Sequence, residues 1–308
     1  MILAHARGAL GATLSSSVIG GTTARRGRIL TRLLGMRALA DGPDVHLAFQ
    51  RMQHNPQKSH MAADTKDSVT IVRGDREVEF TVVNDVTAWR ARTAMSKEPG
   101  TIAWLEEFQP GDVLVDVGAN VGIYSLCAAR FKDVRVFAFE PESQNFSVLN
   151  ENIYRNSLDH LVTAYCVALS DQRKFDLLYL AQFIAGGSCH MLGASLSPSL
   201  KPREAPFRQG CVSTTLDELI AERVIPVPQH VKIDVDGLEH KVVKGADATF
   251  RDPRLKSVLV ELNTTLDEHW EVVDGMLERG FTYDSAEAEL ARRSEGPFAG
   301  TGNYVFRR

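Results

Sequence analysis

Asp116-Val117-Gly118-Ala119-Asn120-Val121-Gly122 is the stretch that decides the fold, because it stands where an apolar strand pattern gives way to a helical one. At such a turn, Gly118 lets the chain bend sharply and lets a ligand approach the backbone, and Gly122 permits a helix to pack closely on a strand. The N–H groups of the first helical turn then face the ligand. A structural tight turn also needs glycines, so the spacing alone leaves both interpretations open.

On both sides of this turn, short apolar runs alternate with helical patterns, which predicts βαβ units and a parallel sheet in an α/β fold. The predicted strands cover residues 113–117, 134–139, 161–169, 231–235 and 257–262, and the predicted helices cover 121–129, 144–156, 215–222 and 239–250. Residues 281–284 and 304–307 are expected to form a terminal pair, with the last strand antiparallel. A smaller β excursion is expected to flank the Gly/Ser/Pro-rich residues 186–206, a candidate substrate lid.

The N-terminal part differs in composition from the rest of the chain. Residues 1–40 contain six arginines and no acidic residue, so we expect residues 1–66 to be a basic, disordered extension and linker. Residues 67–308 are expected to form the catalytic domain, beginning with a hairpin over 68–82 and helical segments over 85–105. The basic segment also resembles an organellar transit peptide, and an early start codon is a third interpretation. A cytoplasmic location is the expectation, and an organellar one is the alternative.

Composition excludes several classes of function. The formal net charge of −4 provides no bulk electrostatic reason to expect a nucleic-acid partner. No run approaches the roughly 20 apolar residues that a membrane-spanning helix needs. The four cysteines are widely spaced, with no C-x-x-C and no Cys/His cluster, so we predict reduced thiols and no zinc site. The oligomeric state cannot be predicted.

Two residues near the turn indicate which ligand it takes. Glu140 follows the second predicted strand about 20 residues after the glycines, where an acidic side chain accepts hydrogen bonds from ribose hydroxyls. It could instead be a solvated carboxylate at a strand end. Asn120 occupies the place of the second dinucleotide glycine and would crowd a pyrophosphate. A nucleoside without phosphates therefore fits better than a dinucleotide.

Asp171 follows the third predicted strand, in the segment Ala168-Leu169-Ser170-Asp171. Its carboxylate could accept a hydrogen bond from the exocyclic amine of an adenine. Equally, Ser170 and Asp171 could simply start the next turn, which these residue types often do.

Over residues 98–263 the sequence resembles the FkbM family of S-adenosylmethionine-dependent methyltransferases. The resemblance lies in blocks that recur in the family's order: Glu98-Pro99 with Trp104, Asp116–Gly122, Phe139-Glu140-Pro141 with Asn145, Leu149 and Asn152, Ala168–Asp171, Thr215-Leu216-Asp217, Lys232–Gly237 with Glu239, Lys244-Gly245 and Val260-Glu261. One departure is Asp236, where the family usually carries glutamate.

The resemblance implies a class I methyltransferase sheet, Rossmann-like and mostly parallel with an antiparallel last strand. It also implies S-adenosyl-L-methionine as methyl donor. The turn with Asp116, Gly118, Asn120 and Gly122 would hold the methionine end, Glu140 the ribose and Asp171 the adenine. The expected reaction is O-methylation of a hydroxyl on a sugar, polyketide or other small acceptor, without nucleic acid or a membrane span.

Methyl transfer requires a group that orients the acceptor oxygen and removes its proton. Asp234 is the first candidate because it ends the fourth predicted strand, beside the switch point where α/β folds bind ligands. It could instead cap the following helix turn. Glu239 and Glu261 are the further catalytic candidates. Together with His240 they could equally form a structural charge cluster with Lys232 or Lys241.

Three alternatives remain open from the sequence. If Asp234, Asp236 and Glu261 converge, a divalent metal is conceivable, but their spacing has no metal signature and none is predicted. A nicotinamide-dependent oxidoreductase could use a similar sheet, although the missing middle glycine disfavours it. A non-catalytic module that binds an adenosyl ligand is the third possibility.

Overall fold

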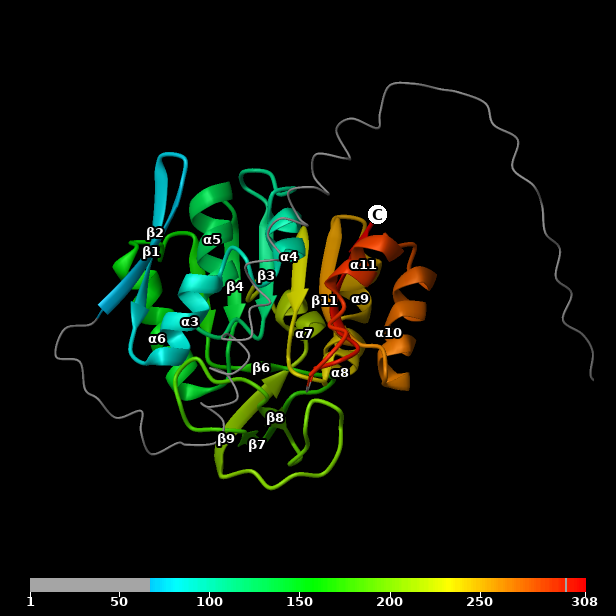
Figure 1. Ribbon diagram of the computed structural model, residues 1–308. Helices are drawn as coiled ribbons and strands as arrows, with labels where there is room; N and C mark the ends of the chain where they lie inside the picture. Colours follow the sequence, from blue (N-terminus) through cyan, green and yellow to red (C-terminus); the bar gives the residue numbers. More distant parts are fainter. Residues whose placement is uncertain (1–66, 297) are drawn as a thin grey trace, which may run out of the picture.

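The computed structural model describes residues 67–296 and 298–308, so the prediction made for residues 1–66 lies outside the described part. A seven-stranded sheet forms the centre of the molecule, in the order β12-β13-β11-β10-β3-β4-β5 (Figure 1). Its strands are β3 (Val113–Val117), β4 (Arg135–Phe139), β5 (Val162–Tyr165), β10 (His230–Ile233), β11 (Ser257–Asn263), β12 (Thr282–Tyr283) and β13 (Thr301–Arg307). β11, β10, β3, β4 and β5 pair in parallel, and β13 inserts antiparallel between β11 and β12. The predicted α/β class and the antiparallel last strand are confirmed.

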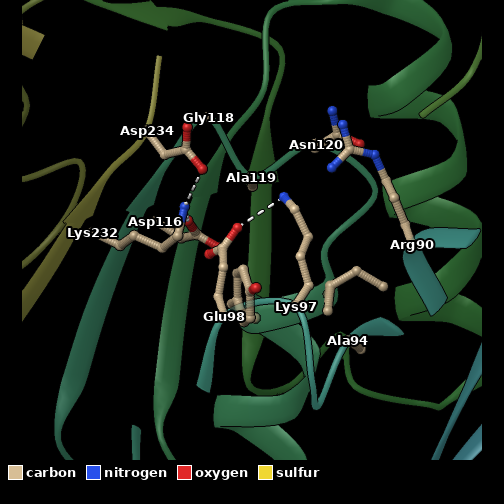
Figure 2. A pocket seen from close by; sticks show the side chains of 12 residues that line it. Arg90, Ala94, Lys97, Glu98, Asp116, Gly118, Ala119, Asn120, Lys232 and Asp234 are labelled. Atoms are coloured by element: carbon tan, nitrogen blue, oxygen red, sulfur yellow. Dashed lines mark hydrogen bonds and ion pairs between the residues drawn. The ribbon is translucent and has the colours of Figure 1, made fainter. Parts of the chain in front are cut away.

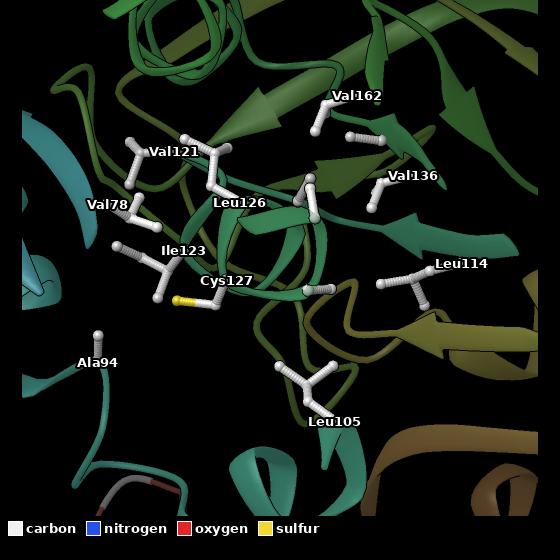
Figure 3. Close-up of a cluster of buried hydrophobic side chains, with 14 of the residues drawn as sticks. Val78, Ala94, Leu105, Leu114, Val121, Ile123, Leu126, Cys127, Val136 and Val162 are labelled. Atoms are coloured by element: carbon white, nitrogen blue, oxygen red, sulfur yellow. The ribbon is translucent and has the colours of Figure 1, made fainter. Parts of the chain in front are cut away.

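Helices cover both faces of this sheet because successive strand residues point to opposite sides. Leu114 belongs to one hydrophobic cluster and Val115 to the other. The elements on the Leu114 face are the hairpin β1 (Asp67–Arg73) and β2 (Arg76–Val82), α3 (Asp85–Thr93), α4 (Pro99–Leu105), α5 (Ile123–Lys132) and α6 (Ser143–Arg155). Figure 3 shows part of this core, with Leu126 of α5 close to Val121 at the turn. The elements on the other face are α7 (Leu216–Ala221), α8 (Glu239–Lys244), α9 (Asp247–Arg251), α10 (Asp267–Glu278) and α11 (Ser285–Ala291).

A second sheet of four strands lies at the lower end of the central sheet in Figure 1, in the order β6-β9-β7-β8. Its strands are β6 (Ala168–Leu169), β7 (Lys174–Leu180), β8 (Met191–Leu192) and β9 (Phe207–Thr214). The long connection between β7 and β9 contains residues 186–206 and returns to the residues that follow β10, where Cys189 N donates to Asp236. The predicted β excursion is therefore a sheet of its own.

Two predicted elements are wrong in extent. The strand predicted over 161–169 is two strands, because β5 ends at the sheet edge and β6 finds a partner in β9 of the second sheet. The helix predicted over 239–250 is divided into α8 and α9 at Gly245, against which the carbonyl of Ser170 packs. Helices α10 and α11 were not predicted. None of the helices in residues 67–296 and 298–308 has the length and apolar character needed to cross a lipid bilayer.

Candidate functional site

The turn after β3 is shaped by the close approach of two chain segments. Gly118 has φ +79°, and a Cβ atom added there would lie 1.9 Å from the carbonyl oxygen of Asp234. Non-glycine residues rarely adopt this backbone conformation, and no side chain fits in this space. Gly118 therefore brings the end of β3 and the end of β10 together, and both border the site.

Replacing Gly118 by alanine is expected to lower the free energy of unfolding by about 2–4 kcal/mol, from left-handed strain and overpacking together. Chemical denaturation measures the change. Gly210→Ala in β9 is the matched control, because no atom lies within 4 Å of the added Cβ; it should change stability by less than about 1 kcal/mol. Equal stability of the two variants would contradict the close approach at Gly118.

Gly122 is also in the left-handed region, with φ +86°, and it is the N-cap of α5. A Cβ atom added there would lie 2.4 Å from Leu149 Cδ1 of α6 and 2.8 Å from Leu126 Cδ1. The sequence predicted that Gly122 permits packing of a helix on a strand, whereas the structure places helix α6 against it.

Glu140, at the end of the neighbouring strand, binds the main chain of the turn after β3. It follows β4, is 5% exposed, and accepts hydrogen bonds from the main-chain N–H groups of Asn120 (2.8 Å) and Glu142 (2.8 Å). Burial raises the pKa of Glu140 to about 7, although these two N–H groups act in the opposite direction. The structure thus joins the predicted residues Asn120 and Glu140, and each carboxylate oxygen retains a lone pair for a further donor.

A pocket opens between this turn, the end of β10, the start of α5 and the segment that runs from α3 to the residue before α4 (Figure 2). Its lining residues are Arg90, Ala94, Lys97, Glu98, Asp116, Gly118, Ala119, Asn120, Ile123, Tyr124, Lys232 and Asp234. Asp116, Gly118, Asn120 and Asp234 were candidates from the sequence. The pocket lies at the carboxyl ends of β3 and β10, where open α/β sheets bind their ligands.

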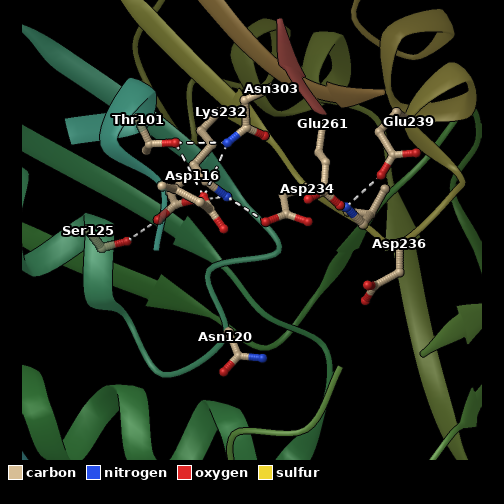
Figure 4. A network of polar contacts seen from close by, with 12 residues as sticks. Thr101, Asp116, Asn120, Ser125, Lys232, Asp234, Asp236, Glu239, Glu261 and Asn303 are labelled. Carbon is tan, nitrogen blue, oxygen red and sulfur yellow. Dashed lines mark hydrogen bonds and ion pairs between the residues drawn. The ribbon is translucent and has the colours of Figure 1, made fainter. Parts of the chain in front are cut away.

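The most deeply buried cation in the pocket is Lys232 of β10, whose side chain is 3% exposed. Its Nζ atom lies 3.1 Å from Asp234 Oδ2 and 3.9 Å from Asp116 Oδ1, and it lies over the ring of Tyr124 (Figure 4). Burial lowers the pKa of Lys232, but the charges of Asp234, Asp116 and Glu98 outweigh burial and raise it above its usual value. Lys232 is therefore an ammonium group that compensates several carboxylates.

Asp116 and Asp234 differ in their remaining capacity for hydrogen bonds. Asp116 Oδ2 accepts from Ser125 Oγ at 2.5 Å, while the buried Oδ1 atom accepts no hydrogen bond within the described residues. Burial raises the pKa of Asp116 against the opposing charge of Lys232. Asp234 is 27% exposed at the pocket wall. One buried acceptor and one accessible carboxylate therefore face the same pocket.

The other acidic candidates have protein partners. Glu239 is 1% exposed and accepts from Val235 N (2.9 Å) and Gly237 N (3.0 Å), and it lies 3.3 Å from His269 Nε2. Burial raises the pKa of Glu239 to about 8 despite these N–H groups. Glu239 thus holds the loop after Asp234, and its partner is His269, not Lys232 or Lys241.

Glu261 of β11 forms an ion pair with Arg293 at 3.2 Å. Asp236, in the left-handed region with φ +60°, accepts a hydrogen bond from Cys189 N at 2.7 Å. Burial raises the pKa of Asp236 to about 6, with the charge of Asp234 adding to the effect. No group of three or more His, Cys, Asp or Glu side chains suited to a metal ion occurs in the described part of the chain.

Asp171 does not line the pocket, and neither do the other candidates Gly122, Glu140, Glu239 and Glu261. The Oδ2 atom of Asp171 lies 3.3 Å from Lys244 Nζ at the end of α8, and its side chain is 20% exposed. Burial raises the pKa of Asp171, but Lys244 outweighs this effect and keeps it below the usual value. The structure therefore shows a surface ion pair at Asp171, and its role toward adenine stays a prediction.

Three cationic pocket residues were missed as site residues. Arg90 and Lys97 come from α3 and the segment before α4, and nothing local in the sequence predicts their place beside Asp116. Lys232 did have a signal, since a lysine inside an apolar strand run must find a buried partner.

A strap over residues 185–189, within the predicted lid, is held against the turn by side-chain amides. Asn84 Nδ2 donates to Ala185 O, Asn145 donates to Gly187 O and accepts from Gly186 N, and Asn120 Nδ2 donates to Gly187 O. The strap therefore lies beside Asn120, which lines the pocket.

Comparison with known proteins agrees with this geometry. The family model described as Methyltransferase FkbM domain matches residues 116–283. The hexuronic acid methyltransferase AglP of Haloferax volcanii is 29% identical over 189 residues, covering 61% of this chain and 71% of the relative. The 31-O-demethyl-FK506 methyltransferase FkbM of Streptomyces tacrolimicus is 30% identical over 219 residues, covering 63% of this chain and 79% of the relative. A crystal structure of a methyltransferase FkbM from Methylobacillus flagellatus KT aligns with TM-score 0.45 and 14% identity, over 66% of this chain and 44% of that chain.

Proposed function

Because the chain belongs to the Methyltransferase FkbM domain family, we propose that it transfers a methyl group from S-adenosylmethionine to a hydroxyl oxygen of a sugar, polyketide or other small acceptor. Family membership decides against the oxidoreductase alternative. The observation that carries the proposal is the pocket in which the turn after β3 meets Asp234. We further propose that residues 67–308 form one methyltransferase domain.

The residues of the pocket fit the methionine end of the donor. Asp116 Oδ1 is a buried acceptor without a hydrogen-bond donor in the described residues, and an α-ammonium group would satisfy it. At Gly118 the backbone is free of a side chain, so a ligand can approach it. Glu140, joined to Asn120, would accept from the ribose hydroxyls with its remaining lone pairs.

In the proposed reaction, Asp234 is the catalytic residue that binds the acceptor hydroxyl and takes its proton. S-adenosylmethionine, when bound, supplies a methyl group on a positively charged sulfur. The acceptor oxygen forms the new bond to the methyl carbon with its own lone pair, the carbon–sulfur pair stays on sulfur, and the hydroxyl proton moves to Asp234. Lys232 holds one oxygen of Asp234 at 3.1 Å and so orients the other.

Glu239 and Glu261 remain candidates for a supporting role in the same reaction. Glu239 acts as a positioning residue, because its hydrogen bonds to Val235 and Gly237 fix the loop that begins at Asp234. Glu261 is next to this loop in Figure 4 and contributes negative charge that the cation of Arg293 balances.

The choice of an oxygen acceptor is supported by the name of the FkbM relative, which gives 31-O-demethyl-FK506 as its substrate. The name of the AglP relative gives a hexuronic acid. Both are small or sugar-like molecules.

The proposal is tested with the full chain, methyl-labelled S-adenosylmethionine and an extract of host metabolites. The expected result is one labelled small molecule, whose methylated oxygen is then located by NMR. Absence of donor binding in a direct titration would overturn the proposed function, and label that is found only on nitrogen or carbon would overturn the choice of oxygen.

Affinity for the donor is expected to rise with pH because of Glu140. With a pKa of about 7, Glu140 is protonated at pH 6 and ionised at pH 8, and the ionised carboxylate is the stronger acceptor for ribose hydroxyls. The dissociation constant of S-adenosylhomocysteine should therefore fall by up to about tenfold from pH 6 to pH 8. Binding releases a proton in this range.

Isothermal titration at several pH values in two buffers measures both effects. Glu140→Gln should flatten the pH dependence, while Glu278→Gln, at an exposed position of α10, should retain it. An equally steep profile in Glu140→Gln would contradict the assignment of Glu140 to the ribose.

A further inference from the structure

Two arginines donate hydrogen bonds to the strap of residues 185–189, one near each of its ends. Arg90 Nε donates to the carbonyl of Gly186 at 2.6 Å, and a terminal nitrogen of Arg203 donates to the carbonyl of Cys189. Both side chains are half-buried. Figure 2 shows Arg90 reaching from α3 toward Asn120 on one side of the pocket. Within the described residues, each of the two guanidinium groups thus donates one hydrogen bond to the same short stretch of chain.

Neither arginine has a carboxylate partner in residues 67–296 and 298–308, which distinguishes them from the other cations of the site. Each of these cations has a carboxylate oxygen nearby: Lys97 Nζ lies 2.8 Å from Glu98 Oε1, Lys232 Nζ lies 3.1 Å from Asp234 Oδ2, and Arg293 Nη2 lies 3.2 Å from Glu261 Oε1. In addition, Arg203 Nε is buried and has no hydrogen-bond acceptor among the described residues. A buried guanidinium donor without an acceptor is costly, so a ligand that supplies one would be bound favourably.

His190 adds a second unpaired donor to the same stretch. Its Nδ1 atom accepts from the main-chain N–H of Ala181 at 3.2 Å, so the neutral ring carries its hydrogen on Nε2. That Nε2 atom is buried without a partner in the described residues and would lie 3.3 Å from a Cβ atom on Gly187. Burial, followed by the charges of Arg203 and Arg90, lowers the pKa of His190 to about 4, so the ring stays neutral at pH 7. Arg90 binds the carbonyl of Gly186, His190 Nε2 faces Gly187, and Arg203 binds the carbonyl of Cys189, so all three side chains lie along residues 186–190.

We propose that Arg90, His190 and Arg203 form a carboxylate-binding subsite for the acceptor, so that the acceptor is an acidic sugar of the uronic acid type. This inference rests on the proposed function, because it names the substrate of that same site. The planar guanidinium groups match a carboxylate in a two-pronged geometry, and the histidine N–H offers a further donor. Asp234 lines the pocket and Asp236 accepts a hydrogen bond from Cys189 of the same stretch, and their negative charges favour a singly charged carboxylate over a doubly charged phosphate.

A neutral sugar would leave Arg203 Nε and His190 Nε2 without an acceptor, which is a strong basis for discrimination. A carboxylate could also come from the methionine end of the donor, since Arg90 lines the donor pocket. The experiment must therefore report donor binding and acceptor binding separately.

The test uses the full chain and two probes of the same shape, methyl β-D-glucuronide and methyl β-D-glucoside. Titration of S-adenosylhomocysteine comes first, and its failure to bind would overturn the proposed function itself. Each probe is then titrated into the protein saturated with S-adenosylhomocysteine. The expected result is that the glucuronide binds at least about tenfold more tightly than the glucoside, with a preference that decreases as salt is raised.

Variants assign this preference to the named residues. Arg203→Gln and Arg90→Gln are each expected to reduce it to less than about threefold, and Arg203→Gln is expected to leave S-adenosylhomocysteine affinity unchanged. Arg208→Gln, at an exposed position of β9, is the control and should retain the full preference. Equal affinity for the two probes, or binding of neither, would overturn the inference. A third outcome would also overturn the inference: Arg90→Gln loses affinity for S-adenosylhomocysteine, and both variants keep the preference for the glucuronide. In that case Arg90 binds the carboxylate of the donor and not that of the acceptor.

Discussion

Replacing Asp234 by asparagine is expected to lower kcat by about 10²–10⁴-fold while the dissociation constant of S-adenosylhomocysteine stays within about threefold of its original value. Asparagine keeps the size of the side chain, and its carbonyl oxygen can still accept from Lys232. What the variant loses is the carboxylate that takes the proton of the acceptor hydroxyl. The loss should therefore appear in kcat, with little change in binding.

The measurement is transfer of the labelled methyl group to the acceptor identified from the extract, with kcat and KM determined separately. Asp133→Asn is a suitable control, because Asp133 is an exposed residue in the left-handed region at the end of α5, where asparagine is equally tolerated. A kcat for Asp234→Asn within about threefold of the original enzyme would remove Asp234 from the role of base.

The second large effect concerns stability. Lys232→Met is expected to lower the free energy of unfolding by about 3–5 kcal/mol, because it leaves buried carboxylates without their cation. Asp116, 1% exposed, and Glu98, 7% exposed, both lose the charge of Lys232. Burial opposes ionisation of Glu98, and Lys97 and Lys232 together hold its pKa well below the usual range.

Urea denaturation at pH 7 measures this change. The matched control is Lys244→Met, since Lys244 is 75% exposed in its ion pair with Asp171 and should contribute no more than about 1 kcal/mol. If Lys232→Met and Lys244→Met destabilise the protein equally, the compensating role of Lys232 is wrong. Activity of Lys232→Met should also fall at temperatures where the variant is folded, because Asp234 loses the contact that orients it.

Much of the central sheet could be predicted because its signals are local. The run Val113–Val117 was predicted with the bounds that the structure has, since a strand buried on both faces is apolar at nearly every position. The edge of the sheet was less predictable. Residues 162–169 are uniformly suited to a strand, and only the partner available to each part separates β5 from β6.

The residues of the candidate site also fall into two groups, those that local sequence signals predict and those that they do not. Gly118, Asn120 and Glu140 could be found because their spacing on consecutive strand ends follows from the βαβ connection itself. Arg90 could not, because an arginine on a short helix is most often a solvated surface residue. Only the tertiary structure shows that α3 lies beside the pocket, which Arg90 lines.

The amino-acid sequence by itself determined the alternation of strands and helices in the central parallel sheet, the tight turn at Gly118 and the acidic strand ends Glu140 and Asp234, because periodicity and turn chemistry act between near neighbours in the chain. Tertiary structure alone decided which charges compensate one another and which remain unpaired. Lys232 meets Asp116 and Asp234, whereas Arg90 and Arg203 meet no carboxylate in the described residues. The physical reason is that the energy of a charge depends on burial and on the distance to other charges, and both quantities are established only when distant segments pack together.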